Sequence, residues 1–333
     1  MRTKSVILKV FLILILSQAL LSCNIPADSP YSPISFQKKS TMPGNGRSSA
    51  VAFAINGKGY VALGRDSLHN PLNDCWEYDP TQNNWTPKSA FPGAARVKAI
   101  GVSLNGKGYV GLGFNPLYGV YSDTTAYLKD FWMYDPQTDI WTQKAKFPSR
   151  ECDANVSFVY GNYIYVGSGF NGYGFYGTFF KYDAEQDEWT KLNSFPGMAR
   201  SGAVICTNGE LVYFGTGYNT YNENDWWEYF PSNDSWKSLK TMPDKGRENG
   251  VSLSINNRYF VSTGRQFGGP LTGGHVKSDI YEYDAVRNIW YNRGNIPQGN
   301  RENAVTFVIN GIGYIGFGEN NDKVLNDLWS FEP

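Results

Sequence analysis

The sequence predicts an all-β protein made of six copies of one four-stranded unit. Aromatic residues make up 16% of the chain and glycine is frequent, with 36 residues. This mixture suits short strands joined by tight turns and suits long helices badly. A phrase opened by an arginine also returns at intervals of 49, 54, 50, 47 and 54 residues. The opening residues are Arg47, Arg96, Arg150, Arg200, Arg247 and Arg301.

Each unit begins with a predicted hairpin. In the first unit, the alternating run of residues 50–55 is followed by Asn56-Gly57 and by a second apolar run. Asn-Gly between two such runs is a strong hairpin signal. The third strand carries two aromatic residues one position apart, as in Trp76-Glu77-Tyr78-Asp79, and the fourth carries a tryptophan such as Trp85. A Phe-Pro, Met-Pro or Ile-Pro pair closes most units.

Four strands in about 50 residues, with glycines after the second strand and spaced tyrosine and tryptophan behind it, resemble the Kelch repeat, whose units form the blades of a β-propeller. The sixth unit stops after its third strand at Pro333, and residues 36–43 match a fourth strand. We therefore predict a six-bladed Kelch-type β-propeller over residues 35–333. It has four antiparallel strands per blade, and an N-terminal strand closes the last blade and leaves no unpaired edge there.

The first 34 residues predict export and attachment to a membrane. Residues 1–22 combine early basic residues with a short apolar run, which is typical of a signal peptide. The segment Leu20-Leu21-Ser22-Cys23 resembles a bacterial lipobox, which implies a lipid on Cys23. The alternative is an ordinary cleaved signal peptide with a chance cysteine. We expect residues 23–34 to form a tether. We also expect the protein to be lipid-anchored in the cell envelope at the outer membrane, in either the periplasmic or the surface-facing leaflet.

Composition narrows the classes of partner. The 30 basic residues balance the 30 acidic ones, so no positive field gathers nucleic acid. With two histidines and no Cys-x-x-Cys pair, we expect no metal and no cofactor. Cys75, Cys152 and Cys206 cannot all pair with one another, and Cys75 stands where other units carry large apolar residues, so we expect it to be buried. We expect a monomer.

The loops between second and third strands vary in length and are rich in aromatic residues, so we place recognition on their face of the ring. The candidate ligand contacts in these loops are Tyr118, Tyr121, Tyr173, Tyr218, Tyr221 and Phe267. An alternative role for such aromatics is to pack loop against loop. The six unit-opening arginines are further candidates because they should ring the mouth of the channel. Their alternative is a purely structural role in each blade.

The function predicted from this pattern is non-catalytic recognition of a glycan or a peptide. The alternative is a carbohydrate-active enzyme of the sialic acid epimerase (mutarotase) or lyase-like kind, a resemblance at the level of the fold. Glu151, Asp153, Glu248, Glu302 and Glu319 could approach the axis as carboxylate pairs. An aspartate recurs just before most of the third strands and could suggest a calcium site. Its repetition at one blade position instead favours a structural role, in which the carboxylate holds loop amides. These residues are Asp74, Asp130, Asp225, Asp279 and Asp327.

The lipobox resemblance makes a direct prediction. Replacing Cys23 by alanine should release the protein from the membrane fraction, because the lipidated cysteine would be its only strong attachment. Fractionation followed by immunoblotting measures the partition. Wild type and Cys23→Ala protein that partition identically would show that no lipid is attached.

Overall fold

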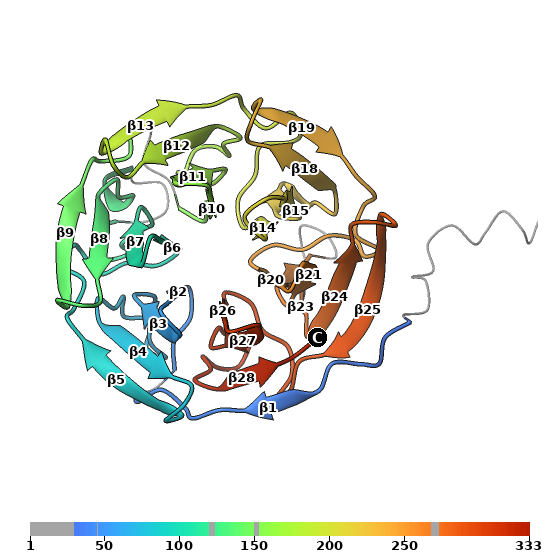
Figure 1. The fold of residues 1–333 in the computed structure, drawn as a ribbon, viewed down its shortest axis with the longest axis horizontal. Helices are drawn as coiled ribbons and strands as arrows, with labels where there is room; N and C mark the ends of the chain where they lie inside the picture. Colours follow the sequence, from blue (N-terminus) through green and yellow to red (C-terminus); the bar gives the residue numbers. More distant parts are fainter. Residues whose placement is uncertain (1–29, 45, 120–123, 150–152, 268–272) are drawn as a thin grey trace, which may run out of the picture.

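The protein is a six-bladed β-propeller. The structure is a computed structural model that describes residues 30–44, 46–119, 124–149, 153–267 and 273–333. Six four-stranded antiparallel sheets stand around a central axis, each with its first strand innermost (Figure 1). The predicted all-β fold, the six blades and the four strands per blade are confirmed. The predicted signal peptide and the predicted lipidation residue Cys23 lie outside the described residues.

The first three blades follow one another along the chain. Blade 1 consists of β2 (Val51–Ile55), β3 (Lys58–Ala62), β4 (Cys75–Asp79) and β5 (Asn84–Lys88). Blade 2 consists of β6 (Ile100–Leu104), β7 (Lys107–Gly111), β8 (Phe131–Asp135) and β9 (Ile140–Lys144), with the 3₁₀ turn η1 (Thr124–Ala126) in its loop. Blade 3 consists of β10 (Val156–Tyr160), β11 (Tyr163–Gly167), β12 (Phe179–Asp183) and β13 (Glu188–Lys191).

The other three blades include two added hairpins. Blade 4 consists of β14 (Val204–Thr207), β15 (Val212–Gly215), β18 (Trp226–Phe230) and β19 (Ser235–Ser238), with β16 (Tyr218–Asn219) and β17 (Tyr221–Asn222) as its hairpin. Blade 5 consists of β20 (Val251–Ile255), β21 (Arg258–Ser262), β24 (Asp279–Asp284) and β25 (Ile289–Asn295), with β22 (Arg265–Gln266) and β23 (His275–Val276) as its hairpin. Blade 6 consists of β26 (Val305–Ile309), β27 (Ile312–Gly316), β28 (Leu328–Phe331) and β1 (Phe36–Lys38).

The hydrophobic core lies between neighbouring blades. Val61 and Tyr78 of blade 1, for example, pack in one cluster with Phe307 of blade 6. The blades approach so closely that a Cβ atom on Gly59 would lie 2.5 Å from the Phe307 ring. This contact explains the glycine before the tyrosine in the second strand of that unit. Cys75 is buried, as predicted, and it is a free thiol.

In blades 1 to 5, the repeated tyrosines and the turns that follow them hold the blade to the one before it through an arrangement that we call the inter-blade clasp. In blade 2, Asp139 accepts hydrogen bonds from the Tyr134 hydroxyl at 2.6 Å and from the Ser89 amide of blade 1 at 3.0 Å. The Trp141 indole donates to the Ser89 carbonyl at 2.9 Å. Blades 1, 3, 4 and 5 have an asparagine or an aspartate at the position of Asp139, and each adopts the same left-handed backbone conformation. These residues are Asn83, Asp187, Asp234 and Asn288. Asparagine and aspartate tolerate that conformation best among side-chain-bearing residues.

The N-terminal segment closes the ring as predicted. Phe36 of β1 pairs with Phe331 of β28, and their rings lie 5.1 Å apart. Blade 1 also clasps this segment, because the Asn83 side chain accepts a hydrogen bond from the Ser40 amide at 3.0 Å. Blade 6 has no turn between its third and fourth strands, so residues 31–34 secure its seam with blade 5 instead. Ile34 donates its amide to the Arg293 carbonyl at 3.0 Å.

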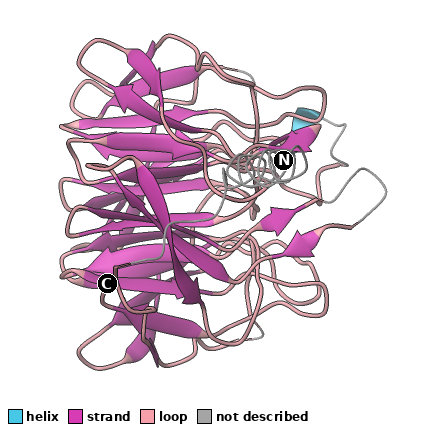
Figure 2. Ribbon diagram, turned by 90° about the vertical axis from the view of Figure 1, so that its right-hand side faces the viewer, coloured by secondary structure: helices cyan, strands magenta, loops and turns pink. Residues whose placement is uncertain are grey.

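The two faces of the ring differ. The hairpins β16–β17 and β22–β23 and the turn η1 project from one face, seen on the right of Figure 2, which we call the loop face. The opposite face carries short turns such as Asn56-Gly57. Among the described residues, no helix has the length and apolarity needed to cross a membrane.

Candidate functional site

A closed circle of six backbone hydrogen bonds surrounds the channel at the loop face. One residue per blade donates its amide to the carbonyl of its counterpart in the preceding blade, over distances of 2.9 to 3.2 Å. Ser49 of blade 1 donates to Asn303 of blade 6, which completes the circle. The members of this channel ring are Ser49, Lys98, Ala154, Gly202, Asn249 and Asn303.

All six members of the channel ring have positive φ angles, between 50° and 60°. Five of them are not glycine, and this conformation costs such residues on the order of 1 kcal/mol or more each. It persists only where the surroundings enforce it, so the ring is a tightly specified feature. Beneath the ring, the innermost strands line a channel with a volume of about 330 Å³.

Five of the unit-opening arginines are buried and paired with aspartates within their own blade. Arg96 is fully buried and donates to both carboxylate oxygens of Asp130, at 2.7 and 2.8 Å, and to the Leu112 carbonyl at 3.0 Å. The Trp132 indole donates to the same carboxylate at 2.8 Å. Burial raises the pKa of Asp130, but the bonds from Arg96 and Trp132 outweigh it and lower that pKa overall. The equivalent pairs are Arg47–Asp74, Arg200–Asp225, Arg247–Asp279 and Arg301–Asp327.

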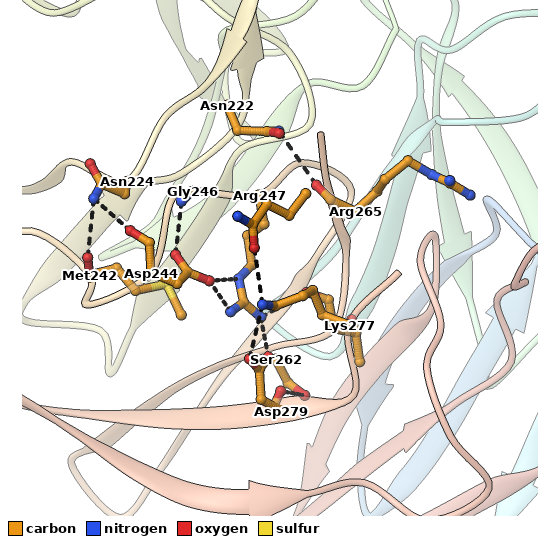
Figure 3. A network of polar contacts seen from close by, with 12 residues as sticks. Asn222, Asn224, Met242, Asp244, Gly246, Arg247, Ser262, Arg265, Lys277 and Asp279 are labelled. Atoms are coloured by element: carbon orange, nitrogen blue, oxygen red, sulfur yellow. Dashed lines mark hydrogen bonds and ion pairs between the residues drawn. The ribbon is translucent and has the colours of Figure 1, made fainter. Parts of the chain in front are cut away.

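Blade 5 adds a second carboxylate to its arginine, as Figure 3 shows. Arg247 donates Nη1 to Asp279 at 2.6 Å and Nε to Asp244 at 3.1 Å, and its Nη2 also contacts Asp244. The Lys277 ammonium lies 3.7 Å from the other oxygen of Asp279. This lysine adds a second positive charge beside the two carboxylates.

The predicted ring of ligand-binding arginines therefore takes another form in the structure. Arg47, Arg96, Arg200, Arg247 and Arg301 direct their guanidinium groups into the blades, and we leave them out of the candidate site at the channel mouth. The repeated aspartates are structural, as expected, but they hold arginines and not loop amides.

Arg150 lies outside the described residues. The strand register of blade 3 shows that Arg150 does not correspond to the other unit-opening arginines, whose equivalent position falls two residues later in the sequence. In the other blades the arginine stands four residues before the first strand, and the residue four before Val156 is Cys152. The aspartate position of blade 3 is Thr178, so this blade lacks both partners. The absence of an aspartate there was the sequence signal that could have corrected the alignment.

Charged side chains gather on one side of the channel mouth, in what we call the charged sector: Arg65, Arg265, Glu302 and Glu319. Arg65 Nη2 lies 2.8 Å from both carboxylate oxygens of Glu319, and Arg265 Nε lies 2.7 Å from Glu302. The channel ring supports them, because Asn303 donates to Glu319 at 3.1 Å. Blades 5, 6 and 1 thus present fixed donors and acceptors at the mouth.

Two further carboxyl groups near the mouth have raised pKa values. Burial raises the pKa of Asp153 to about 6, against the lowering effect of Lys98. Burial also raises the pKa of Glu248 to about 7, and the neighbouring Glu302 adds to the rise while Lys98 and Arg265 oppose it. Of the five carboxylates considered from sequence, the structure brings Asp153, Glu248, Glu302 and Glu319 to the mouth, and Glu151 lies outside the described residues.

Aromatic side chains occupy the side of the mouth formed by blades 3 to 5. Phe170, Phe175, Tyr218 and Phe267 form an aromatic row with successive ring-centroid distances of 5.0, 6.0 and 5.5 Å. Phe170 and Tyr218 bridge to Asp153 and Ser201, which adjoin members of the channel ring, so the row borders the mouth.

Other loop tyrosines stand near this row or elsewhere on the loop face. Tyr173 and Tyr221, in the loops that carry Phe175 and Tyr218, are 74% and 71% exposed. Tyr118 is also exposed, in the loop of blade 2. Tyr121 lies outside the described residues. Sequence reasoning missed Phe170 and Phe175 as members of the row, although both stand in a loop that it singled out.

These features define a six-bladed β-propeller, and its sequence contains a Kelch motif. The family description "Kelch motif" matches residues 46–92, which contain blade 1. Among solved structures, the chain is similar to the protein of "Structure of YjhT", with a TM-score of 0.74 and 19% identity over 87% of this chain and 96% of that chain. At this identity the likeness shows the fold alone. No curated protein sequence matches the chain.

The buried arginine pairs generate a stability prediction. Arg200→Ala should cost about 3–5 kcal/mol of unfolding free energy, because it leaves the Asp225 carboxylate without its main partner. Arg287→Ala removes an exposed pair with Asp284 and is the matched control, expected to melt like wild type. Thermal denaturation measures both. If Arg200→Ala has the same melting temperature as the control, the structural role is wrong and these arginines remain candidate ligand contacts.

Proposed function

We propose that the loop face recognises a glycan or a peptide at the channel mouth without catalysing a reaction. The observation that carries this proposal is the juxtaposition of the aromatic row with the charged sector across one opening. Aromatic rings offer flat apolar surfaces at low entropic cost, and the charged sector offers donors and acceptors already held in place. A ligand with apolar faces and polar edges matches both halves.

The rigid scaffold supports this assignment. The channel ring joins all six blades at the loop face, and the first residues of the aromatic row and the charged sector bridge to its neighbours, so the side chains at the mouth are positioned before a ligand arrives. Preorganisation lowers the entropic cost of binding. The exposed Tyr173 and Tyr221 stand above this base and are our first choice for direct ligand contacts.

A second candidate function is catalysis on a carbohydrate, of the epimerase (mutarotase) or lyase-like kind. The observation that favours it is the pKa of Glu248, which burial raises to about 7. Such a carboxyl group is present in both protonated and ionised forms at neutral pH, which suits a general acid or base. Interconversion of sialic acid anomers, followed by NMR with wild type and Glu248→Gln, separates this function from simple recognition.

We also propose that the protein is held at the bacterial envelope by a lipid on Cys23. Supporting this arrangement, Tyr31 and Ile34 contact blade 5 at the outer rim of the ring, where Arg293 donates to the Ser32 carbonyl at 2.9 Å. The described part of the chain starts at this outer rim, where β1 is the outermost strand of blade 6, and not at the channel mouth (Figure 1). The loop face would stay accessible to large ligands.

The recognition proposal is tested with glycan and peptide arrays, followed by calorimetry on the ligands retained. Tyr173→Ala and Tyr221→Ala should each weaken binding by about tenfold or more while melting like wild type, since both side chains are exposed. Val286→Ala, at an exposed turn on the opposite face, is the control. Retention of no glycan or peptide, or tyrosine variants that bind like wild type, would refute this site.

A further inference from the structure

Glu248 differs from the other acidic residues at its position in the repeat. The residue that follows the position of the unit-opening arginine is acidic in three blades, as Asp153, Glu248 and Glu302. Asp153 is buried, and Glu302 accepts a hydrogen bond from Arg265 at 2.7 Å. Glu248 is partly exposed, and its carboxylate makes no hydrogen bond or ion pair with the residues that the structure describes. Its oxygens also reach the surface, so this carboxyl group is open to a ligand.

The arginine that stands opposite Glu248 is engaged with other acceptors. Arg265 and Glu248 pair through their backbones in a β-bridge. The guanidinium of Arg265 donates Nε to Glu302 at 2.7 Å and Nη2 to Asn321 at 2.9 Å. Its Nη1 contacts the Gly273 carbonyl. Arg265 therefore lies near Glu248 without neutralising it directly.

The ionisable groups around Glu248 have an excess of negative charge. Burial is the main cause that raises the pKa of Glu248 to about 7, and Glu302 and Asp153 add to the rise. Lys98 and Arg265 are the cations that oppose it. When all five groups are ionised, three carboxylates face two positive charges. One further cation would balance them, whereas an anion would be repelled.

The aromatic row lies near this carboxyl group. Gly202 of blade 4 packs against Glu248, because a Cβ atom on Gly202 would lie 3.2 Å from the Glu248 Cβ. The residue before Gly202 bridges to Tyr218, and Phe267 stands in the blade-5 loop that begins opposite Glu248. The rings of Tyr218 and Phe267 are 5.5 Å apart. Apolar ring faces and an unpaired carboxylate thus occur together at the junction of blades 4 and 5.

A long basic side chain matches both features. Lysine and arginine lay an apolar stem along apolar surfaces and keep their charge at a polar group. Aromatic faces also attract cations. An amino sugar has no such stem between its ring and its amine, which favours a peptide as the ligand.

We propose that the channel mouth binds a peptide whose basic side chain places its cation at Glu248 and its apolar stem against Tyr218 and Phe267. The cation donates hydrogen bonds to the Glu248 carboxylate and completes the charge balance around it. This proposal rests on the recognition function proposed above and specifies the ligand class of that site.

Calorimetry on the full-length protein tests this assignment with capped five-residue peptides of alanine that carry lysine, arginine or norleucine at the centre. Norleucine keeps the apolar stem of lysine and lacks the charge. At pH 8 we expect the tighter of the two basic peptides to bind at least about tenfold more strongly than the norleucine peptide. The same basic peptide should bind at least about fivefold more weakly at pH 5.5, where Glu248 is protonated while lysine and arginine stay charged.

Two variants show whether Glu248 is responsible. Glu248→Gln should remove the preference for a charged peptide and most of the pH dependence. It should melt no lower than wild type, since this side chain has no described partner to lose. Glu210→Gln, at an exposed turn on the opposite face, removes the same charge and is the control, expected to bind like wild type.

Separate outcomes distinguish this assignment from recognition at the mouth in general. Equal binding of the norleucine peptide, unchanged binding by Glu248→Gln, or tighter binding of glucosamine than of either basic peptide would overturn it. If no peptide binds while the arrays retain a glycan that Tyr173→Ala releases, the basic-peptide assignment is wrong and recognition at the mouth stands.

Discussion

The channel ring is the constraint on which the rest of this structure depends. Six backbone hydrogen bonds, each between one blade and the preceding one, form a circle. The bond from Ser49 of blade 1 to Asn303 of blade 6 closes it. Left-handed residues make these bonds at a conformational cost, which the packing between blades must offset. The closure is repeated at the outer edge, where β1 completes blade 6 and blade 1 clasps Ser40.

Because the scaffold repeats in nearly every blade, function is best sought where the repeat is broken. The arginine–aspartate pairs serve the blades, and their uniformity explains why arginine is so regular in sequence. The type of residue that directly follows the glycine after each second strand instead varies from blade to blade. It holds Arg65, Arg265 and Glu319 on one side of the mouth and Phe114, Phe170 and Tyr218 on the other.

The sequence predicts the fold well because the signals of the repeat are local. Asn-Gly turns, alternating runs and the Tyr and Trp spacing each report a contact within a blade or with its neighbour, and the missing last strand reveals the closure. The site is harder to predict because its parts come from distant segments. Arg65 and Glu319 are separated by 254 residues, and no local pattern shows that they meet. Arginine repeated near the axis also looks the same in sequence whether it faces a ligand or a buried aspartate.

Amide hydrogen exchange at the six members of the channel ring tests the central claim most directly. If the ring is one closed circle, these amides open only when the whole propeller unfolds, and their exchange rates should agree within about tenfold at the slow limit set by global stability. The account would be contradicted if the Ser49 amide, at the seam of blades 6 and 1, exchanged about a hundredfold faster than the amides of Gly202 and Asn249.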